Sequence, residues 1–319
     1  MTKTIVGIED THNTHNSGDD FIMLPVVDFV FKLLFGDAKN TKRLSSLLSA
    51  ILKLPEEEFS EIELLNPEIE REFKEDKKGI LDIRVRLKDG KQINIEIQVM
   101  PFSLMPERTL FYWSKMYSRQ IGKGQGYESL KKCITINIVD YKLLPIEKIH
   151  AVYHLTEDIE KHRLTDVLEI HFIDLERLRN SARAADSLDI KLLKWLRFLS
   201  AKTKGEMEME AKKDVEIKEA YEYLQNISED DKNRMVYEAR EAWLMDQRTR
   251  ENLARKEGRE EGQKEGRKEG RKEGRKEGHE EGRIDEQKKI AKNMLASGFT
   301  VEQISKLTGL SANEIAQLK

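Results

Sequence analysis

The rhythm of apolar and polar positions changes several times along the chain. Residues 21–178 mix short runs of alternating apolar residues with stretches of helical period, and residues 179–254 keep a helical period throughout. Glycine then recurs at every fourth position in 255–284, and an apolar helical pattern returns in 285–319. We therefore expect a flexible tail over 1–20, a compact domain, a helical region, a charged arm and a small helical tail, in that order.

The mixed region predicts an α/β fold. The pattern indicates helices over 25–35, 40–52 and about 106–121, and strands over 61–65, 80–87, 92–100, 132–140, 150–155 and 167–173. A run of strands followed by a helix and a further strand is typical of a mixed sheet flanked by helices.

One hairpin in this region has a register that the sequence can decide. Asp89-Gly90 separates two alternating runs, 79–87 and 92–99. A two-residue loop would mix apolar and polar residues on both faces, which a half-buried sheet disfavours. A three-residue loop, 88–90, with Gly90 in the left-handed conformation, puts all the apolar residues on one face. We therefore predict pairing of Val85 with Ile93 and of Asp82 with Glu96.

The polar face of this hairpin places two carboxylates opposite each other. Like charges at such a pair destabilise a sheet, and a divalent cation held between Asp82 and Glu96 would remove that cost. Oxygen ligands with open coordination positions suit Mg²⁺, and Gln98 points to the same side. Taken alone, such a pair is more often a solvated strand face, here with Arg84 neutralising the carboxylates.

Composition narrows the class of protein. The chain has 319 residues, of which 38% are hydrophobic and 36% charged, and a net charge of −3, so any basic surface must be local. The lone Cys133 rules out an internal disulfide and a cysteine zinc site. No apolar run is long enough for a membrane span and the polar start is no signal peptide, so we expect a cytoplasmic protein.

A series of short motifs runs through roughly residues 21–180. In chain order these are Asp28-x-x-Phe31-Lys32-x-x-Phe35-Gly36, Leu81-Asp82, Ile95-Glu96-Ile97-Gln98, Arg108 with Tyr112, Gly124-x-x-Tyr127 and Ile134–Val139. Their order and spacing resemble the PD-(D/E)XK nuclease superfamily, and within it the Rpn family of recombination-promoting nucleases and putative transposases. Leu81 stands where the superfamily's name has proline, and Gln98 where it has lysine.

This resemblance implies a restriction-endonuclease-like fold and a DNA endonuclease linked to recombination or transposition. It implies that Asp82, Glu96 and the carbonyl of Ile97 ligate Mg²⁺ or another divalent cation. Gln98 lacks basicity and positive charge, so it could only orient the attacking water. The alternative is a catalytically inactive, transposase-derived protein that binds DNA or oligomerises.

Further acidic residues are candidates for this site. Asp28 on the first helix could be an additional metal group, or could simply form an exposed ion pair with Lys32 four residues later. Glutamates also alternate at 68, 70 and 72, and we take Glu70 as the candidate although the alternation does not choose among them.

A basic stripe is predicted on the helix after the hairpin. The spacing of Arg108, Tyr112, Lys115 and Arg119 places them on one helix face, where they could contact DNA phosphates. A solvated helix face is the alternative.

The last third of the chain predicts extended helical elements. Seven glycines would cost a helix about 1 kcal/mol each, so we expect a marginally helical arm that tethers or oligomerises, or a disordered spacer. In 285–319 the spacing of Ile304, Gly309 and Ile315 fits a helix-turn-helix that docks on DNA, or a plain helical hairpin.

Overall fold

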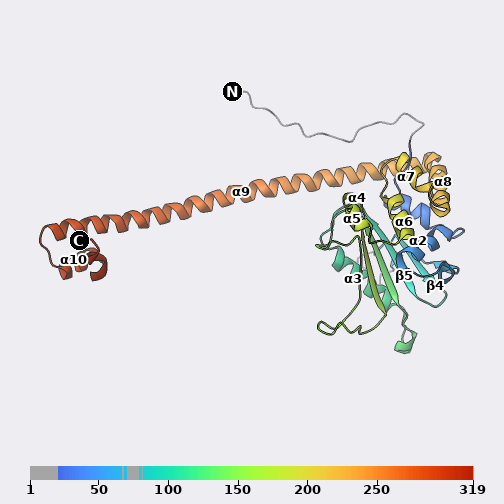
Figure 1. Cartoon of the computed structure of the whole chain (residues 1–319), viewed down its shortest axis with the longest axis horizontal. Helices are drawn as coiled ribbons and strands as arrows, with labels where there is room; N and C mark the ends of the chain where they lie inside the picture. Colours follow the sequence, from blue (N-terminus) through green and yellow to red (C-terminus); the bar gives the residue numbers. More distant parts are fainter. Residues whose placement is uncertain (1–20, 67, 70–78, 81, 319) are drawn as a thin grey trace, which may run out of the picture. The chain divides into compact units, whose positions relative to one another are not determined.

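The computed structural model describes residues 21–66, 68–69, 79–80 and 82–318. The chain divides between residues 244 and 245 into two compact units. The first unit holds a six-stranded sheet flanked by helices, as the sequence predicts (Figure 1). The second contains the rest of a long helix and two short ones.

The main sheet mixes parallel and antiparallel pairs. Its strand order is β1-β4-β5-β6-β8-β7, in which β5, β6 and β8 run parallel and the other neighbours antiparallel. A separate two-stranded ladder joins β2 and β3. The strand bounds are β1 Ile62–Leu64, β2 Glu68–Ile69, β3 Gly79–Ile80, β4 Ile83–Leu87, β5 Gln92–Gln98, β6 Cys133–Val139, β7 His150–Tyr153 and β8 Leu168–Asp174.

Helices occupy the start of the first unit, the β5–β6 connection and most of the chain after the sheet. Two further short 3₁₀ helices are Glu56–Phe59 and Tyr127–Ser129. The α-helices are α1 Asp28–Phe35, α2 Lys42–Leu52, α3 Met105–Ser118, α4 Leu175–Asn180, α5 Ala182–Ala185, α6 Ile190–Ser200, α7 Lys204–Ala211, α8 Val215–Glu229, α9 Asp231–Ala296, α10 Val301–Thr308 and α11 Ala312–Ala316.

The β4–β5 hairpin has the predicted register. Ile83 pairs with Ile95 and Val85 with Ile93, and the loop contains three residues. Gly90 has φ = +86°, the left-handed conformation that the three-residue loop requires and glycine adopts without strain. This confirms the prediction that the apolar residues of both strands share one face.

That apolar face of the sheet carries the main core. The buried residues of β4, β5 and β6 pack there against α1, α2, α6 and α8, and Trp195 of α6 is among the largest side chains enclosed. Burying each such aliphatic or aromatic side chain contributes about 1.5–3 kcal/mol before entropy is counted. The consequence for function is that α1 is fixed firmly against the sheet beside the β4–β5 hairpin.

The opposite face is polar, but it is covered rather than solvated. Helix α3 crosses it, and Thr109 donates to the Asn137 amide oxygen at 3.1 Å while Trp113 donates to the Cys133 carbonyl at 3.0 Å (Figure 1). Gln92, Asn94 and Glu96 of β5 are consequently buried beneath it. Arg84 donates to Gln92 at 2.8 Å. The alternative of a solvated strand face therefore fails for the β5 half of the hairpin, whereas Arg86 on the β4 half is exposed.

The second unit contains a small core of its own. Ala291 of α9 packs with Ile304 of α10, and Leu310 and Ile315 complete the cluster. Thr300 and Ser311 form capping boxes at the starts of α10 and α11. The glycine tetrads lie within α9, which continues through them as a helix. Among the described residues, no helix combines the length and apolarity needed to cross a membrane.

Candidate active site

The end of the β4–β5 hairpin brings together the predicted metal ligands. Asp82 immediately precedes β4, and Glu96 lies near the end of β5, facing α3. The amide N–H of Ile97 donates to Asp82 Oδ2 at 2.8 Å. Because the N–H and C=O of an extended residue point to the same side of a strand, the Ile97 carbonyl also faces the Asp82 side. Asp82, Glu96 and the Ile97 main chain are therefore neighbours where the β4–β5 ladder ends.

Helix α1 brings Lys32 to Asp82, whereas the sequence offered Asp28 as a partner for this lysine. Lys32 Nζ lies 3.1 Å from Asp82 Oδ1. Asp28, one turn earlier, instead binds Arg240 of α9 through both carboxylate oxygens, at 2.9 and 2.5 Å. The ion pair between Asp28 and Lys32, one of the two alternatives for Asp28, therefore gives way to these two contacts, and both carboxylate oxygens of the candidate metal group Asp28 accept from Arg240. The sequence could not reveal this, because the spacing of the two residues says nothing about which neighbours the fold supplies.

A second cation, Arg108, contacts Glu96 from the face of the sheet that α3 covers. Arg108 of α3 approaches Glu96 Oε2 at 3.3 Å, and the Asn94 amide donates to Glu96 Oε1 at 3.4 Å. Asp82 and Glu96 are called the acidic pair below. Arg108, which the sequence predicted as a DNA contact, therefore contacts one member of this pair.

Burial makes the two negative charges costly. Desolvation, followed by the negative charge of Asp82, raises the pKa of Glu96 to about 7, against the opposing positive charge of Arg108. Desolvation also raises the pKa of Asp82, against the charge of Lys32 and the Ile97 hydrogen bond. The site therefore holds two carboxyl groups whose simultaneous ionisation calls for a nearby cation.

The carboxylates lie deeper than the cations that contact them. The side chain of Asp82 is 11% exposed against 37% for Lys32, and that of Glu96 is 5% exposed against 31% for Arg108. A phosphate approaching from solvent would therefore meet positive side chains in front of the acidic pair.

The other residues that the sequence predicted for the site have varied surroundings. Gln98 ends β5, two residues beyond Glu96, and is half-buried. Tyr112 packs with Met116 and Cys133 against the sheet. The predicted stripe on α3 therefore turns partly inward. Lys115 lies with its Nζ 5.0 Å from the Phe111 ring centre, Arg119 caps the C-terminus of α3, and Glu70 lies outside the described residues.

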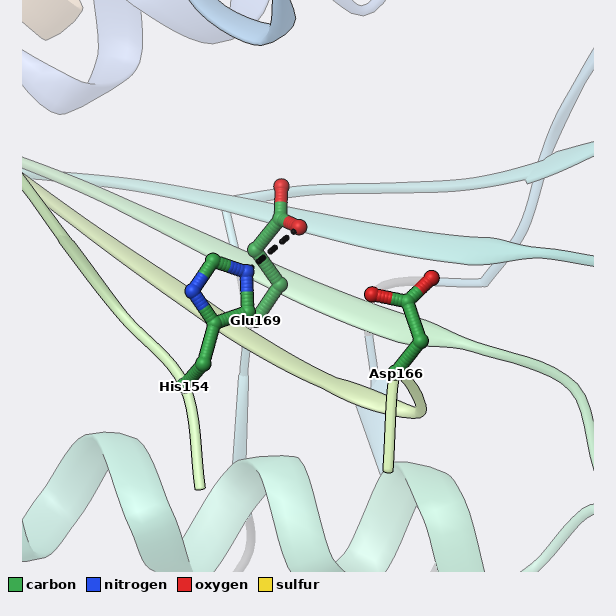
Figure 2. A group of neighbouring side chains, drawn as sticks. All are labelled: His154, Asp166 and Glu169. Carbon is green, nitrogen blue, oxygen red and sulfur yellow. Dashed lines mark hydrogen bonds and ion pairs between the residues drawn. The ribbon is translucent and has the colours of Figure 1, made fainter. Parts of the chain in front are cut away.

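A second group of potential metal ligands lies elsewhere in the same domain. His154 and Glu169 approach within 3.0 Å, and Asp166 is the third member (Figure 2). Glu169 pairs with Ile134 on β6, whereas Glu96 pairs with Asn137, so the two acidic groups lie on opposite faces of the sheet. His154, Asp166 and Glu169 form no recognised ligand motif in the sequence, so only the fold brings them together.

The charges of this second group are already balanced within the chain. Lys132 Nζ lies 2.8 Å from Glu169 and 3.1 Å from Asp166, and Arg163 also binds Asp166. His171 contacts the other Glu169 oxygen at 2.8 Å. We therefore interpret this group as an ionic network that joins β6, β8 and the β7–β8 connection.

A six-stranded mixed sheet between helices, with acidic residues at the end of its central hairpin, defines a restriction-endonuclease-like α/β domain. Comparison with protein families gives a match to the PD-(D/E)XK nuclease family transposases over residues 25–253. Because this match covers more than half of the chain, the protein belongs to that family, as the sequence motifs predicted.

A second family match concerns the C-terminal tail. Residues 285–319 match the C-terminal helix-turn-helix domain of the Rpn/YhgA-like nuclease family. This favours the helix-turn-helix over the plain helical hairpin. Comparisons with curated proteins and with solved structures gave no match.

Proposed function

We propose that this protein is a Mg²⁺-dependent DNA endonuclease that acts in recombination or transposition. The observation that carries the proposal is the convergence of Asp82, Glu96 and the Ile97 main chain at the end of the hairpin. Family membership supports a nuclease-related role, and the helix-turn-helix match supports DNA as the partner.

The chemistry of the donor set suits a hard divalent cation. Asp82, Glu96 and the Ile97 carbonyl offer oxygen atoms, which Mg²⁺ prefers. Desolvation raises the pKa of both carboxyl groups even with Lys32 and Arg108 nearby, so a bound cation would favour their ionised forms. A bound cation would lower the pKa of a water molecule and stabilise negative charge on the phosphate.

The side chains of this site then have separable tasks in hydrolysis. The oxygen of a water molecule attacks phosphorus, and the bond from phosphorus to one sugar oxygen breaks. The water proton passes to solvent, and the leaving oxygen takes a proton from solvent. In this proposal Gln98 orients the water through its amide, and Arg108, 3.3 Å from Glu96, binds a phosphate oxygen.

Plasmid nicking tests this proposal. Supercoiled plasmid should be nicked by the purified full chain with Mg²⁺ and left intact with EDTA. Asp82→Asn and Glu96→Gln should each lower the rate by at least about 10²-fold, because each removes a ligand charge. Asp166→Asn is the matched control: it removes an exposed carboxylate from the second acidic group, and the rate should stay at the wild-type level.

Two outcomes would contradict the proposal. Nicking by the Asp82→Asn, Glu96→Gln double variant at the wild-type rate would exclude this site as the catalytic centre. Salt-sensitive DNA binding by the wild type without any cleavage would favour the inactive, DNA-binding alternative that the glutamine at position 98 raises.

A further inference from the structure

Helix α1 holds Lys32 in a fixed position beside the acidic pair. Val30, Phe31 and Leu34 of this helix are buried in the main core. Asp28 anchors the same helix to α9 through its double contact with Arg240. The backbone of Lys32 is therefore immobilised on both sides, and only its side chain is free to change direction.

The ammonium of Lys32 contacts the carboxylate oxygen that the main chain leaves available. Asp82 Oδ2 accepts from the Ile97 N–H, while Lys32 Nζ lies 3.1 Å from Oδ1. Lys32 therefore stands where a cation approaching Oδ1 would have to bind. At 37% exposure its side chain also has room to turn toward solvent.

The charges of the proposed reaction require another positive group. A divalent cation balances the charges of Asp82 and Glu96, whereas the phosphodiester brings a further negative charge that grows during attack. Gln98 is neutral, and Arg108 approaches Glu96 from α3. Lys32 approaches Asp82 from the opposite side, so the two cations can hold a phosphate from two directions.

We propose that Lys32 has two roles in turn: it is the internal counter-ion of Asp82 before metal binds, and it binds a phosphate oxygen of DNA afterwards. A divalent cation held by Asp82 would compete with the ammonium for this carboxylate, and repulsion between the like charges would favour an outward orientation of Lys32, toward a bound phosphate. The second role makes Lys32 a catalytic residue and rests on the nuclease function proposed above. The first concerns metal binding alone.

The two roles predict opposite effects of a single substitution. In Lys32→Met the competing cation is gone, so Mn²⁺, used as a paramagnetic probe, should bind on the order of ten-fold more tightly. Single-turnover cleavage at saturating Mg²⁺ should instead fall roughly 10²-fold or more, because a donor to the phosphate is lost. A merely structural role would weaken both, since a distorted site binds metal less well.

Two further variants make the comparison specific. Lys32→Arg keeps the positive charge, so Mn²⁺ affinity should stay near that of the wild type and part of the cleavage rate should return. Lys91→Met removes a lysine that pairs with Asp89 in the hairpin loop, and should change neither quantity. Circular dichroism of each variant verifies that the fold is retained.

The outcomes separate this inference from the proposed function. Equal Mn²⁺ affinity of wild type and Lys32→Met, measured by electron paramagnetic resonance, overturns the counter-ion role whether or not the protein cleaves DNA. An unchanged cleavage rate in Lys32→Met overturns the phosphate role while the nuclease proposal stands. A wild type that binds Mn²⁺ but never cleaves refutes the nuclease proposal. In that case the comparison of Mn²⁺ affinity between wild type and Lys32→Met still decides the counter-ion role.

Discussion

Glu96 shows how a single residue can be placed for chemistry at the expense of stability. It is 4% exposed, and desolvation together with the charge of Asp82 raises its pKa to about 7. A group held in this way must be ionised to bind metal, and its ionisation is costly until metal arrives. Such perturbed carboxyl groups are characteristic of functional sites.

This cost predicts that Glu96→Gln stabilises the metal-free protein at alkaline pH. The folded pKa of about 7 lies above the ordinary value of 4.5, so the folded state retains a proton that the unfolded state loses. The contribution of Glu96 to stability therefore falls as pH rises from about 4.5 to 7. Relative to wild type, the variant should gain about 2–3 kcal/mol across this window.

Urea unfolding in EDTA at pH 5 and pH 8.5 measures this effect. Glu63→Gln provides the control, because Glu63 is 60% exposed and pairs with Arg86 on the surface, so its substitution should change little at either pH. A Glu96→Gln variant whose advantage is the same at both pH values, or is larger at pH 5, would contradict the argument.

For single residues, the sequence predicted which side chains share a strand face, but not which side chains form ion pairs with them. The alternation of the hairpin was enough to put Asp82 opposite Glu96, since strand register fixes which side chains share a face. It could not place Lys32 against Asp82 or Arg240 against Asp28, because these contacts join segments whose relative positions only the tertiary fold determines.

At the scale of elements, helix α3 buries polar residues of the hairpin that the sequence alone would leave exposed to solvent. Alternation predicts which residues of β5 are polar, and by itself it indicates a solvated surface. The helix between β5 and β6 instead covers that surface, and Gln92, Asn94 and Glu96 are buried. The sequence predicted both elements but not their stacking, because the face that α3 turns to the sheet mixes the apolar Met105 and Met116 with the polar Thr109.

The glycine tetrads of α9 should limit the stability of this helix. A β-carbon added at Gly266, Gly270 or Gly274 would meet no atom within 4 Å, and all three lie within α9. Substituting all three by alanine should therefore favour the helix by about 1 kcal/mol per site. We expect slower amide hydrogen exchange over the tetrads and greater helicity by circular dichroism.

Gly309 offers a control with the opposite sign. It also has open space around its α-carbon, but its φ of +76° is unfavourable for alanine. Gly309→Ala should therefore cost about 1 kcal/mol or more and speed exchange in the tail. Faster exchange in the alanine-substituted tetrads would show that glycine there serves something other than helix formation in α9.

At the scale of the whole molecule, the chain separates a candidate catalytic unit from a candidate DNA-docking unit. The first contains the sheet and the acidic pair, and the second has its own small core around Ile304 and Ile315. The sequence indicated both from changes in composition and period. It left the role of the tail open, because the exposed residues of α11 and its C-cap include Asn313, Glu314 and Gln317 and no positive charge.

This division predicts that the tail contributes DNA affinity but no chemistry. A chain ending at residue 284 should nick plasmid at saturating DNA at the rate of the full chain, because the main core excludes residues 285–319. Its affinity for duplex DNA should fall about ten-fold at moderate salt, with a shallower dependence on salt concentration, because fewer phosphates are contacted.

A full-length variant refines this last test. Asn313→Ala with Gln317→Ala removes neutral side chains from the exposed surface of α11, so affinity should fall while the salt dependence stays unchanged, since no counterion release is lost. Fluorescence anisotropy at several salt concentrations measures both quantities. Equal affinity of the shortened and full chains would assign DNA binding to residues before 285, which include the first unit with Arg108 and Lys32 and the basic residues of the tetrads.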